Sequence, residues 1–155
     1  MSKIVEPYLK KLDYLKDKLE DIGQRAVKEN VDLIIYTLQE KQLSKGLDSS
    51  GSIVGTYSKY TALLASDPHN KPREPKIPGQ KYNMDWTGEL FETMSVRAER
   101  DSYSIFSTTG KDDYLRRNTS FGEIMKLTQD NNQWINEEII LPYIQKFILD
   151  NFLLV

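Results

Sequence analysis

Asp85-Trp86-Thr87-Gly88-Glu89-Leu90-Phe91 is the stretch around which this chain is organised. Three large apolar residues, Trp86, Leu90 and Phe91, flank a Thr-Gly turn, so the stretch can fill a core where a loop becomes a strand. A helical pattern and a proline-rich segment precede it, and two strand-like segments and a second helical region follow. The sequence therefore predicts an α+β fold.

The composition is that of one globular domain, residues 1–155. The chain carries a formal net charge of −2, with 39% hydrophobic and 28% charged residues, which excludes wholesale disorder and argues against a dedicated nucleic-acid binder. No apolar run reaches the roughly 18 residues of a membrane span. Cysteine is absent, so disulfides and thiolate chemistry are impossible. Because charged residues appear early, we expect no signal peptide and a cytoplasmic site of assembly.

A long helical region is predicted at residues 1–45. Apolar residues recur there at four- and three-residue steps, at Tyr8, Leu12, Leu15, Leu19 and Ile22. Gly23 is the predicted break or kink, and Gly46 supplies a helix stop. We expect the stripe to pack on its own domain. The narrower part before Gly23 is the better candidate for partner contact, with Tyr8, Leu12 and Leu15 as candidate interface residues.

An extended loop is predicted at residues 66–82, after a turn at 46–51 and either a short helix or an irregular aromatic-rich segment at 56–65. Four prolines fall in residues 67–81, where they remove amide donors and fix φ, so neither a helix nor a central strand is expected. An arm that reaches a neighbouring subunit or nucleic acid and a solvated insertion are equally good interpretations. The candidate interface residues of this loop are Lys71, Arg73, Lys76 and Lys81.

A β-hairpin is predicted within residues 86–109. Residues 91–98 and 102–108 alternate between apolar and polar side chains, with a turn at residues 99–101. The alternation places Met94 and Val96 on one side of the first strand, and Tyr103 and Ile105 on one side of the second. We expect a small antiparallel sheet with one wet face.

C-terminal helices are predicted at residues 128–155. Thr128 is the expected N-cap, and Pro142 should break or kink the first helix and open the next. The chain finishes on apolar residues, which we expect to dock on the core or on a partner. Phe152, Leu153 and Leu154 are therefore candidate interface residues.

Residue patterns with a chemical role are sparse. One histidine, His69, without cysteine cannot form a Cys/His zinc site, and no phosphate-binding glycine loop is present. We interpret His69 as a surface residue and the pairs Asp112-Asp113 and Glu137-Glu138 as solvated charge. A small carboxylate-based hydrolase or nuclease assembled across the fold stays an alternative. So does a nucleic-acid-binding module that uses the basic loop.

The order of several fragments resembles that in the tail-completion, or head–tail joining, proteins of tailed-phage virion morphogenesis. The first two fragments are Gln42-Leu43-x-x-Gly46-Leu47-Asp48-x-x-Gly51 and the aromatic segment Tyr57-Ser58-Lys59-Tyr60-Thr61. The basic proline-bearing loop and Thr87-Gly88-Glu89-Leu90-Phe91 follow. Last come Phe121-Gly122-Glu123-Ile124-Met125-Lys126-Leu127-Thr128-x-Asp130-Asn131 and Pro142. The likeness spans residues 39 to 155.

This resemblance implies a structural virion protein that forms or joins a homo-oligomeric ring at the head–tail neck or the tail end. It would act as a tail-completion protein or a connector adaptor. The implied partners are copies of the chain itself and portal, connector or tail-tube proteins, with incidental contact with packaged DNA. No membrane, small-molecule substrate or cofactor is implied. The family brings no catalytic residues, so we expect no enzyme, and a location in the virion after assembly in the host cytoplasm.

Overall fold

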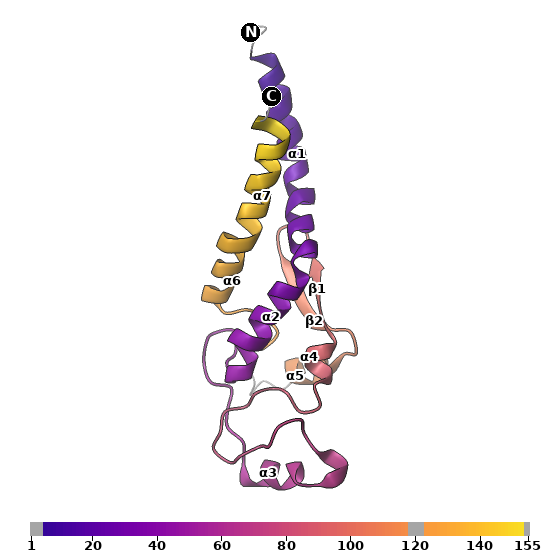
Figure 1. The fold of residues 1–155 in the computed structure, drawn as a ribbon, viewed down its shortest axis with the longest axis vertical. Coiled ribbons are helices and arrows are strands. Elements are labelled where there is room, and N and C mark those ends of the chain that lie inside the picture. Colours follow the sequence, from indigo (N-terminus) through magenta and orange to yellow (C-terminus); the bar gives the residue numbers. More distant parts are fainter. Residues whose placement is uncertain (1–4, 118–122, 154–155) are drawn as a thin grey trace.

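The computed structural model describes residues 5–117 and 123–153. The molecule is elongated (Figure 1): two helical arms occupy one end, a two-stranded sheet lies near the middle, and a loop-rich part occupies the other end. Helix and strand are mixed, with a long N-terminal helix and C-terminal helices, which confirms the predicted α+β fold.

The elements follow one another in a simple order. The N-terminal arm is α1 (Glu6–Glu29) and α2 (Val31–Lys41), which ends in a 3-10 turn at Leu43–Lys45. The middle of the chain forms α3 (Lys59–Ala65), a 3-10 turn at Pro68–Asn70, α4 (Glu89–Glu92), β1 (Met94–Ala98), β2 (Tyr103–Ser107) and α5 (Lys111–Arg117). The C-terminal arm is α6 (Gln129–Ile135), α7 (Leu141–Ile148) and π-helical turns at Asn136–Ile140 and Leu149–Leu153.

The break in the N-terminal arm lies at Asn30 and not at Gly23, where the sequence predicted it. A helix tolerates an internal glycine at a cost of about 1 kcal/mol, and Gly23 stays helical. Asn30 leaves the helical conformation at φ −120°, and its Nδ2 donates to the Ala26 carbonyl at 2.8 Å. Such a side-chain bond competes with the backbone ladder. The predicted stop at Gly46 is confirmed, since this residue caps the 3-10 turn at φ 68°.

The hairpin has the predicted alternation in a shorter form. β1 pairs antiparallel with β2, with Val96 opposite Ile105 and Ala98 opposite Tyr103. The Glu99 amide donates to the Ser102 carbonyl at 2.9 Å and closes the predicted turn. One face joins the main hydrophobic cluster, whose buried members are Val27, Ile34, Leu38, Leu43, Met94, Ile105, Ile124, Met125 and Ile135.

The first strand begins later than predicted because α4 takes up residues 89–92. Gly88 precedes α4 with φ 85°, a left-handed backbone conformation that favours glycine, and the flexible Arg73 guanidinium lies over the position that a Cβ would take. Leu90 and Phe91 lie against the core as expected, but from this helical turn. The Thr93 hydroxyl donates to the Glu89 carbonyl at 2.6 Å and marks the end of the turn.

The helix of the C-terminal arm widens to a π-helical turn just before Pro142 and then continues. Thr128 is the N-cap, as predicted, and accepts from the Asn131 amide at 3.2 Å. The residues before Pro142 form the π-helical turn Asn136–Ile140, after which α7 continues. Proline lacks an amide hydrogen and clashes with the preceding turn of an α-helix, and a π turn relieves both problems. The predicted break is thus a local widening.

We predict that Gln42→Ala lowers the free energy of unfolding by about 2–4 kcal/mol. The fully buried Gln42 side chain donates to the Lys126 carbonyl at 2.7 Å and accepts from the Thr128 amide at 2.9 Å. It therefore ties the end of the N-terminal arm to the start of the C-terminal arm, and its loss strands two backbone groups. Urea unfolding measures the change.

The matched control is Gln133→Ala, whose exposed side chain donates to Glu137 within α6 and the following turn. It should change the unfolding free energy by no more than about 0.5 kcal/mol. Equal losses in the two variants would contradict the structural role assigned to Gln42.

Candidate functional site

The strongest candidate for a functional surface is an apolar stripe on α1 that becomes exposed toward the N-terminal end of the helix. Near the base, Ile22 is 2% exposed and Ala26 is fully buried. Farther out, Leu19 is 43%, Leu12 59% and Tyr8 65% exposed. Leu15 is half-buried. The predicted interface residues Tyr8 and Leu12 therefore lie on an apolar surface that the described chain leaves open to solvent.

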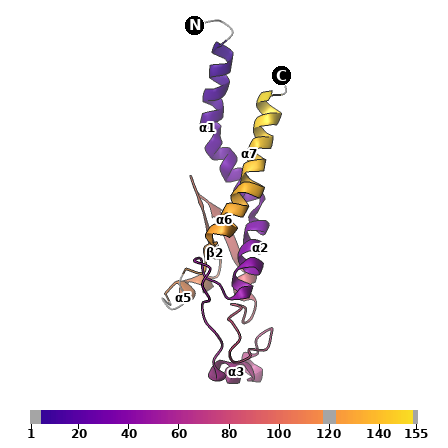
Figure 2. The same ribbon diagram turned by 90° about the vertical axis from the view of Figure 1, so that its left-hand side faces the viewer.

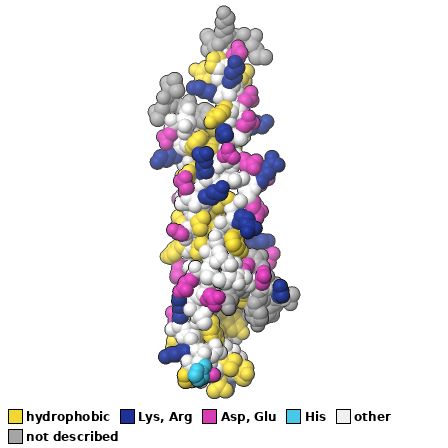
Figure 3. Space-filling model, turned by 90° about the vertical axis from the view of Figure 1, so that its right-hand side faces the viewer, with side chains coloured by type: hydrophobic (Ala, Val, Ile, Leu, Met, Phe, Trp, Pro, Cys, Tyr) yellow, Lys and Arg dark blue, Asp and Glu magenta, His cyan; other side chains and the backbone are white. Residues whose placement is uncertain are grey.

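The two helical arms separate where this stripe is exposed. α1 packs against α7, the π turn at Asn136–Ile140 and β1. Figure 2 shows α1 and the C-terminal helix close together near the sheet and diverging toward the ends that bear the termini. The space-filling view in Figure 3 shows hydrophobic side chains in a broken line along the helical part, between basic and acidic groups.

A second exposed apolar patch lies at the opposite end of the molecule, on α3 (Figure 1). Tyr60 and Leu63 are each 68% exposed, and Leu64 is also exposed. None of the seven residues of this helix, all of which the structure describes, is buried. The helix is one of the two forms that the sequence left open for this segment, whereas the exposed surface was not predicted. The spacing of residues 60, 63 and 64 was the available signal, since it puts three apolar side chains on one face.

The basic loop is tied to the rest of the chain, and two of its four basic candidates are engaged there. Arg73 forms an ion pair with Glu92, and its amide donates to the Trp86 carbonyl at 2.9 Å. Lys71 and Lys81 are exposed, as an interface role requires. The loop also contains the 3-10 turn at 68–70, which the sequence did not predict; Asp67 caps it by accepting from the His69 amide.

Lys76 is the candidate that differs most from expectation, because it is only 4% exposed. Its ammonium donates to Asn83 Oδ1 at 2.9 Å and to the Asp85 carbonyl at 2.6 Å, and lies 5.4 Å from the centre of the Tyr57 ring. Burial lowers the pKa of this ammonium, while Asp85 and Glu74 act in the opposite direction. Lys76 therefore anchors the loop to the segment at Asn83 and Asp85, and its charge is not available for a contact at the surface.

The apolar end of the chain is only partly described. Phe152 and Leu153 belong to the π turn at Leu149–Leu153, and Leu154 lies outside the described residues. Next to them, Leu149 of the same turn is 50% exposed.

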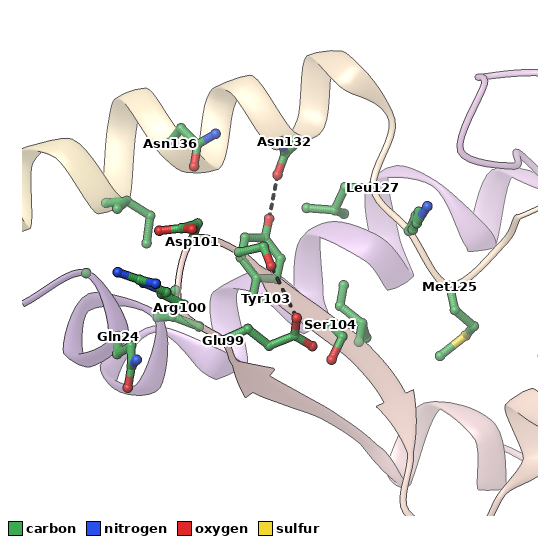
Figure 4. Close-up of a pocket in the computed structure, with 16 residues that line it drawn as sticks. Gln24, Glu99, Arg100, Asp101, Tyr103, Ser104, Met125, Leu127, Asn132 and Asn136 are labelled. Atoms are coloured by element: carbon green, nitrogen blue, oxygen red, sulfur yellow. Dashed lines mark hydrogen bonds between the residues drawn. The ribbon is translucent and has the colours of Figure 1, made fainter. Parts of the chain in front are cut away.

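A groove of about 490 Å³ with a mixed polar and apolar lining lies between α1, the hairpin turn and the C-terminal arm. Figure 4 shows Gln24, Asn132 and Asn136 around its rim, with the Tyr103 ring between them. The Tyr103 hydroxyl donates to Asn132 Oδ1 at 2.7 Å. Burial raises the pKa of Tyr103 to about 12. The charged residues Glu99, Arg100 and Asp101 also line the groove, so neutral and charged groups share it.

The acidic pairs are placed differently from each other. Glu137 and Glu138 are exposed, as interpreted from the sequence. Asp112 is buried, and its carboxylate accepts from the Ser107 amide at 3.1 Å, so the interpretation as solvated charge is wrong there. This acid caps the turn between β2 and α5. Among residues 5–117 and 123–153, three or more acidic or histidine side chains do not come together as a metal site would require. His69 is exposed, as expected.

None of the helices in the described ranges combines the length and apolarity of a membrane span. Comparison with known protein families, with curated proteins and with solved structures gives no match.

We predict that Lys76→Met lowers the free energy of unfolding by about 1–3 kcal/mol, because it removes the ammonium that donates to the Asp85 carbonyl and to Asn83 Oδ1, of which Asn83 Oδ1 keeps the Tyr57 hydroxyl as a donor. It should also speed proteolytic cleavage within residues 66–82. The control Lys71→Met removes an exposed lysine of the same loop and should leave both quantities unchanged. Unfolding curves and limited proteolysis check the pair, and equal effects of the two variants would reject the anchoring role.

A second prediction concerns alkaline pH. The folded-state pKa of Tyr103 is about 12, whereas an unfolded tyrosine ionises near about 10. The stability that Tyr103 contributes is therefore complete below about pH 10 and is lost as the pH rises toward 12. Tyr103→Phe should lose less stability than the wild type between about pH 9 and 11 in urea titrations. Tyr36→Phe, which removes an exposed tyrosine of α2, is the control and should keep the wild-type slope; an unchanged slope in Tyr103→Phe would contradict the assignment.

Proposed function

We propose that this chain is a structural protein of a tailed-phage virion that forms or joins a ring at the head–tail neck or the tail end. The observation that carries the proposal is the exposed apolar stripe of α1, at Tyr8, Leu12 and Leu19. The resemblance in fragment order to tail-completion proteins supports the same conclusion. In this function the chain acts by fitting against other proteins as a tail-completion protein or connector adaptor.

The size of the exposed stripe supports assembly. Burying one large aliphatic or aromatic side chain contributes roughly 1.5–3 kcal/mol, so the α1 residues together offer several kcal/mol. That amount is comparable with the cost of immobilising two proteins against each other. Contiguous exposed apolar surface on a folded chain marks a site of protein contact more often than scattered single residues do.

The position of the two apolar patches suits a bridging role. The α1 stripe lies toward one end of the long axis and the α3 patch, with Tyr60 and Leu63, lies at the other (Figure 1). A ring component that joins a connector to a tail needs contacts on two opposite sides. We assign the α1 end and the α3 end to different neighbours, which include copies of this chain and portal, connector or tail-tube proteins.

In this proposal the protein works in the virion after assembly in the host cytoplasm. The exposed Lys71 and Lys81 permit incidental contact with packaged DNA.

We predict that Leu12→Gln weakens incorporation into assemblies at least about tenfold while changing monomer stability by no more than about 0.5 kcal/mol, because this side chain is already exposed. Size-exclusion chromatography with light scattering measures the assembly, for the chain alone and mixed with portal, connector and tail-tube proteins of the same virion. Asp17→Asn, an exposed substitution on the same helix, serves as the control. A chain that stays monomeric alone and in every mixture would refute the proposed function.

A further inference from the structure

The apolar stripe of α1 follows a strict heptad spacing. Apolar residues fall at alternating three- and four-residue steps, at Val5, Tyr8, Leu12, Leu15, Leu19, Ile22 and Ala26. In heptad notation Val5 and Leu12 take a positions and Tyr8 and Leu15 take d positions. We call these seven residues the α1 seam. A seam of this kind is complementary to another helix, because its side chains insert between those of a facing helix.

The molecule already covers the base of the seam with a helix. Ile22 and Ala26 are buried at the base of α1, which packs against α7, the π turn before it and β1. The outer part, from Val5 to Leu19, continues in the same register and lies where the two arms separate (Figure 2). The occupant that fits the outer seam is therefore also a helix.

Charges along α1 are sorted by their distance from the seam. The positions that flank a seam are e and g, and at residues 9–25 every charged residue there is basic: Lys11, Lys16, Lys18 and Arg25. The acidic residues of the helix up to the same point occupy the outer positions b, c and f: Glu6, Asp13, Asp17, Glu20 and Asp21. Lys10 is the basic residue on the outer side in this range. The border of the exposed seam is thus positively charged.

This sorting excludes some occupants. Two α1 helices packed in parallel would set g residues against e residues, and an antiparallel pair would set g against g and e against e. Each arrangement brings lysines such as Lys11 and Lys16 together, and like charges across such a pair are destabilising. A second α1 is therefore a poor partner for the seam.

The helix that covers the base of the seam indicates the favourable chemistry. The C-terminal arm, residues 129–151, contains four acidic residues and one basic residue: Asp130, Glu137, Glu138, Asp150 and Lys146. An occupant of the outer seam with acidic flanking residues would place opposite charge beside Lys11, Lys16 and Lys18 along the apolar contact.

We propose that the outer α1 seam, Val5 to Leu19, binds an amphipathic helix whose seam-flanking positions are acidic, and that this helix belongs to a different protein because the acidic C-terminal arm of each copy already packs on its own α1. The proposal deepens the proposed function and rests on it, since it names the partner chemistry for one end of the bridge.

Two synthetic helices test the partner chemistry. Both are about three heptads long with Ile at a and Leu at d; one has Glu at every e and g position and the other has Lys there. Fluorescence anisotropy with the full-length chain measures their binding. We expect the Glu peptide to bind at least about tenfold more tightly at low salt, and the difference to shrink as salt screens the flanking charges.

Charge-reversal variants supply the matched control. Lys11→Glu combined with Lys16→Glu leaves every apolar residue of the seam in place and should shift the preference to the Lys peptide. Lys10→Glu combined with Lys28→Glu changes the net charge equally at outer positions and should keep the wild-type preference. Circular dichroism and urea unfolding verify that each variant is folded.

Several outcomes overturn the inference: no binding of either peptide, equal affinities, or tighter binding of a peptide copied from residues 5–26 or 129–151 of this chain. Tighter binding of either copied peptide would assign the seam to a second copy of this chain. Ring assembly without a peptide preference would leave the proposed function standing and remove this inference. A peptide preference in a chain that never assembles with virion proteins would keep the acidic-helix surface and remove the virion role.

Discussion

The apolar seam of α1 is longer than the body that packs against it, and this mismatch governs the rest of the structure. The sheet and the C-terminal arm cover α1 only near its base, where Ile22 and Ala26 are buried. The same helical register then continues outward through residues of equal size that contact solvent, such as Leu12. One repeating pattern thus supplies both buried core residues and an exposed apolar surface, and the two parts differ in whether another element of the chain packs against them.

Most of the fold followed from patterns whose cause is local. The alternation of apolar and polar residues predicted which face of the hairpin packs on the core. Val96 and Ile105 lie on that face, because successive side chains of a strand point to opposite sides. Thr128 was recognisable as an N-cap because its hydroxyl bonds within the same turn. These features require no knowledge of distant parts of the chain.

The errors arose where a distant contact or a competing local bond decided the outcome. Asn30 breaks the N-terminal arm through its own amide, and Gly23 does not. The sequence around Lys76 suggested a solvated charge in a basic loop. In the structure its ammonium is buried and donates hydrogen bonds to Asn83 Oδ1 and the Asp85 carbonyl. Asp112 is buried because a strand-end amide requires an acceptor. For the candidate surface, the sequence indicated Tyr8 and Leu12, but only the fold shows which part of the seam stays uncovered.

The continuity of α1 has a geometric consequence for the position of its outer end. Its 24 residues correspond to about 36 Å of rise, and each residue turns the helix by about 100°. The direction in which Leu12 points is therefore set by the count of residues between it and the anchored base at Ile22. A single inserted residue between them would leave the body unchanged and swing the outer seam to another azimuth. The number of residues in α1 therefore sets both how far the outer seam lies from the base and the direction in which it faces.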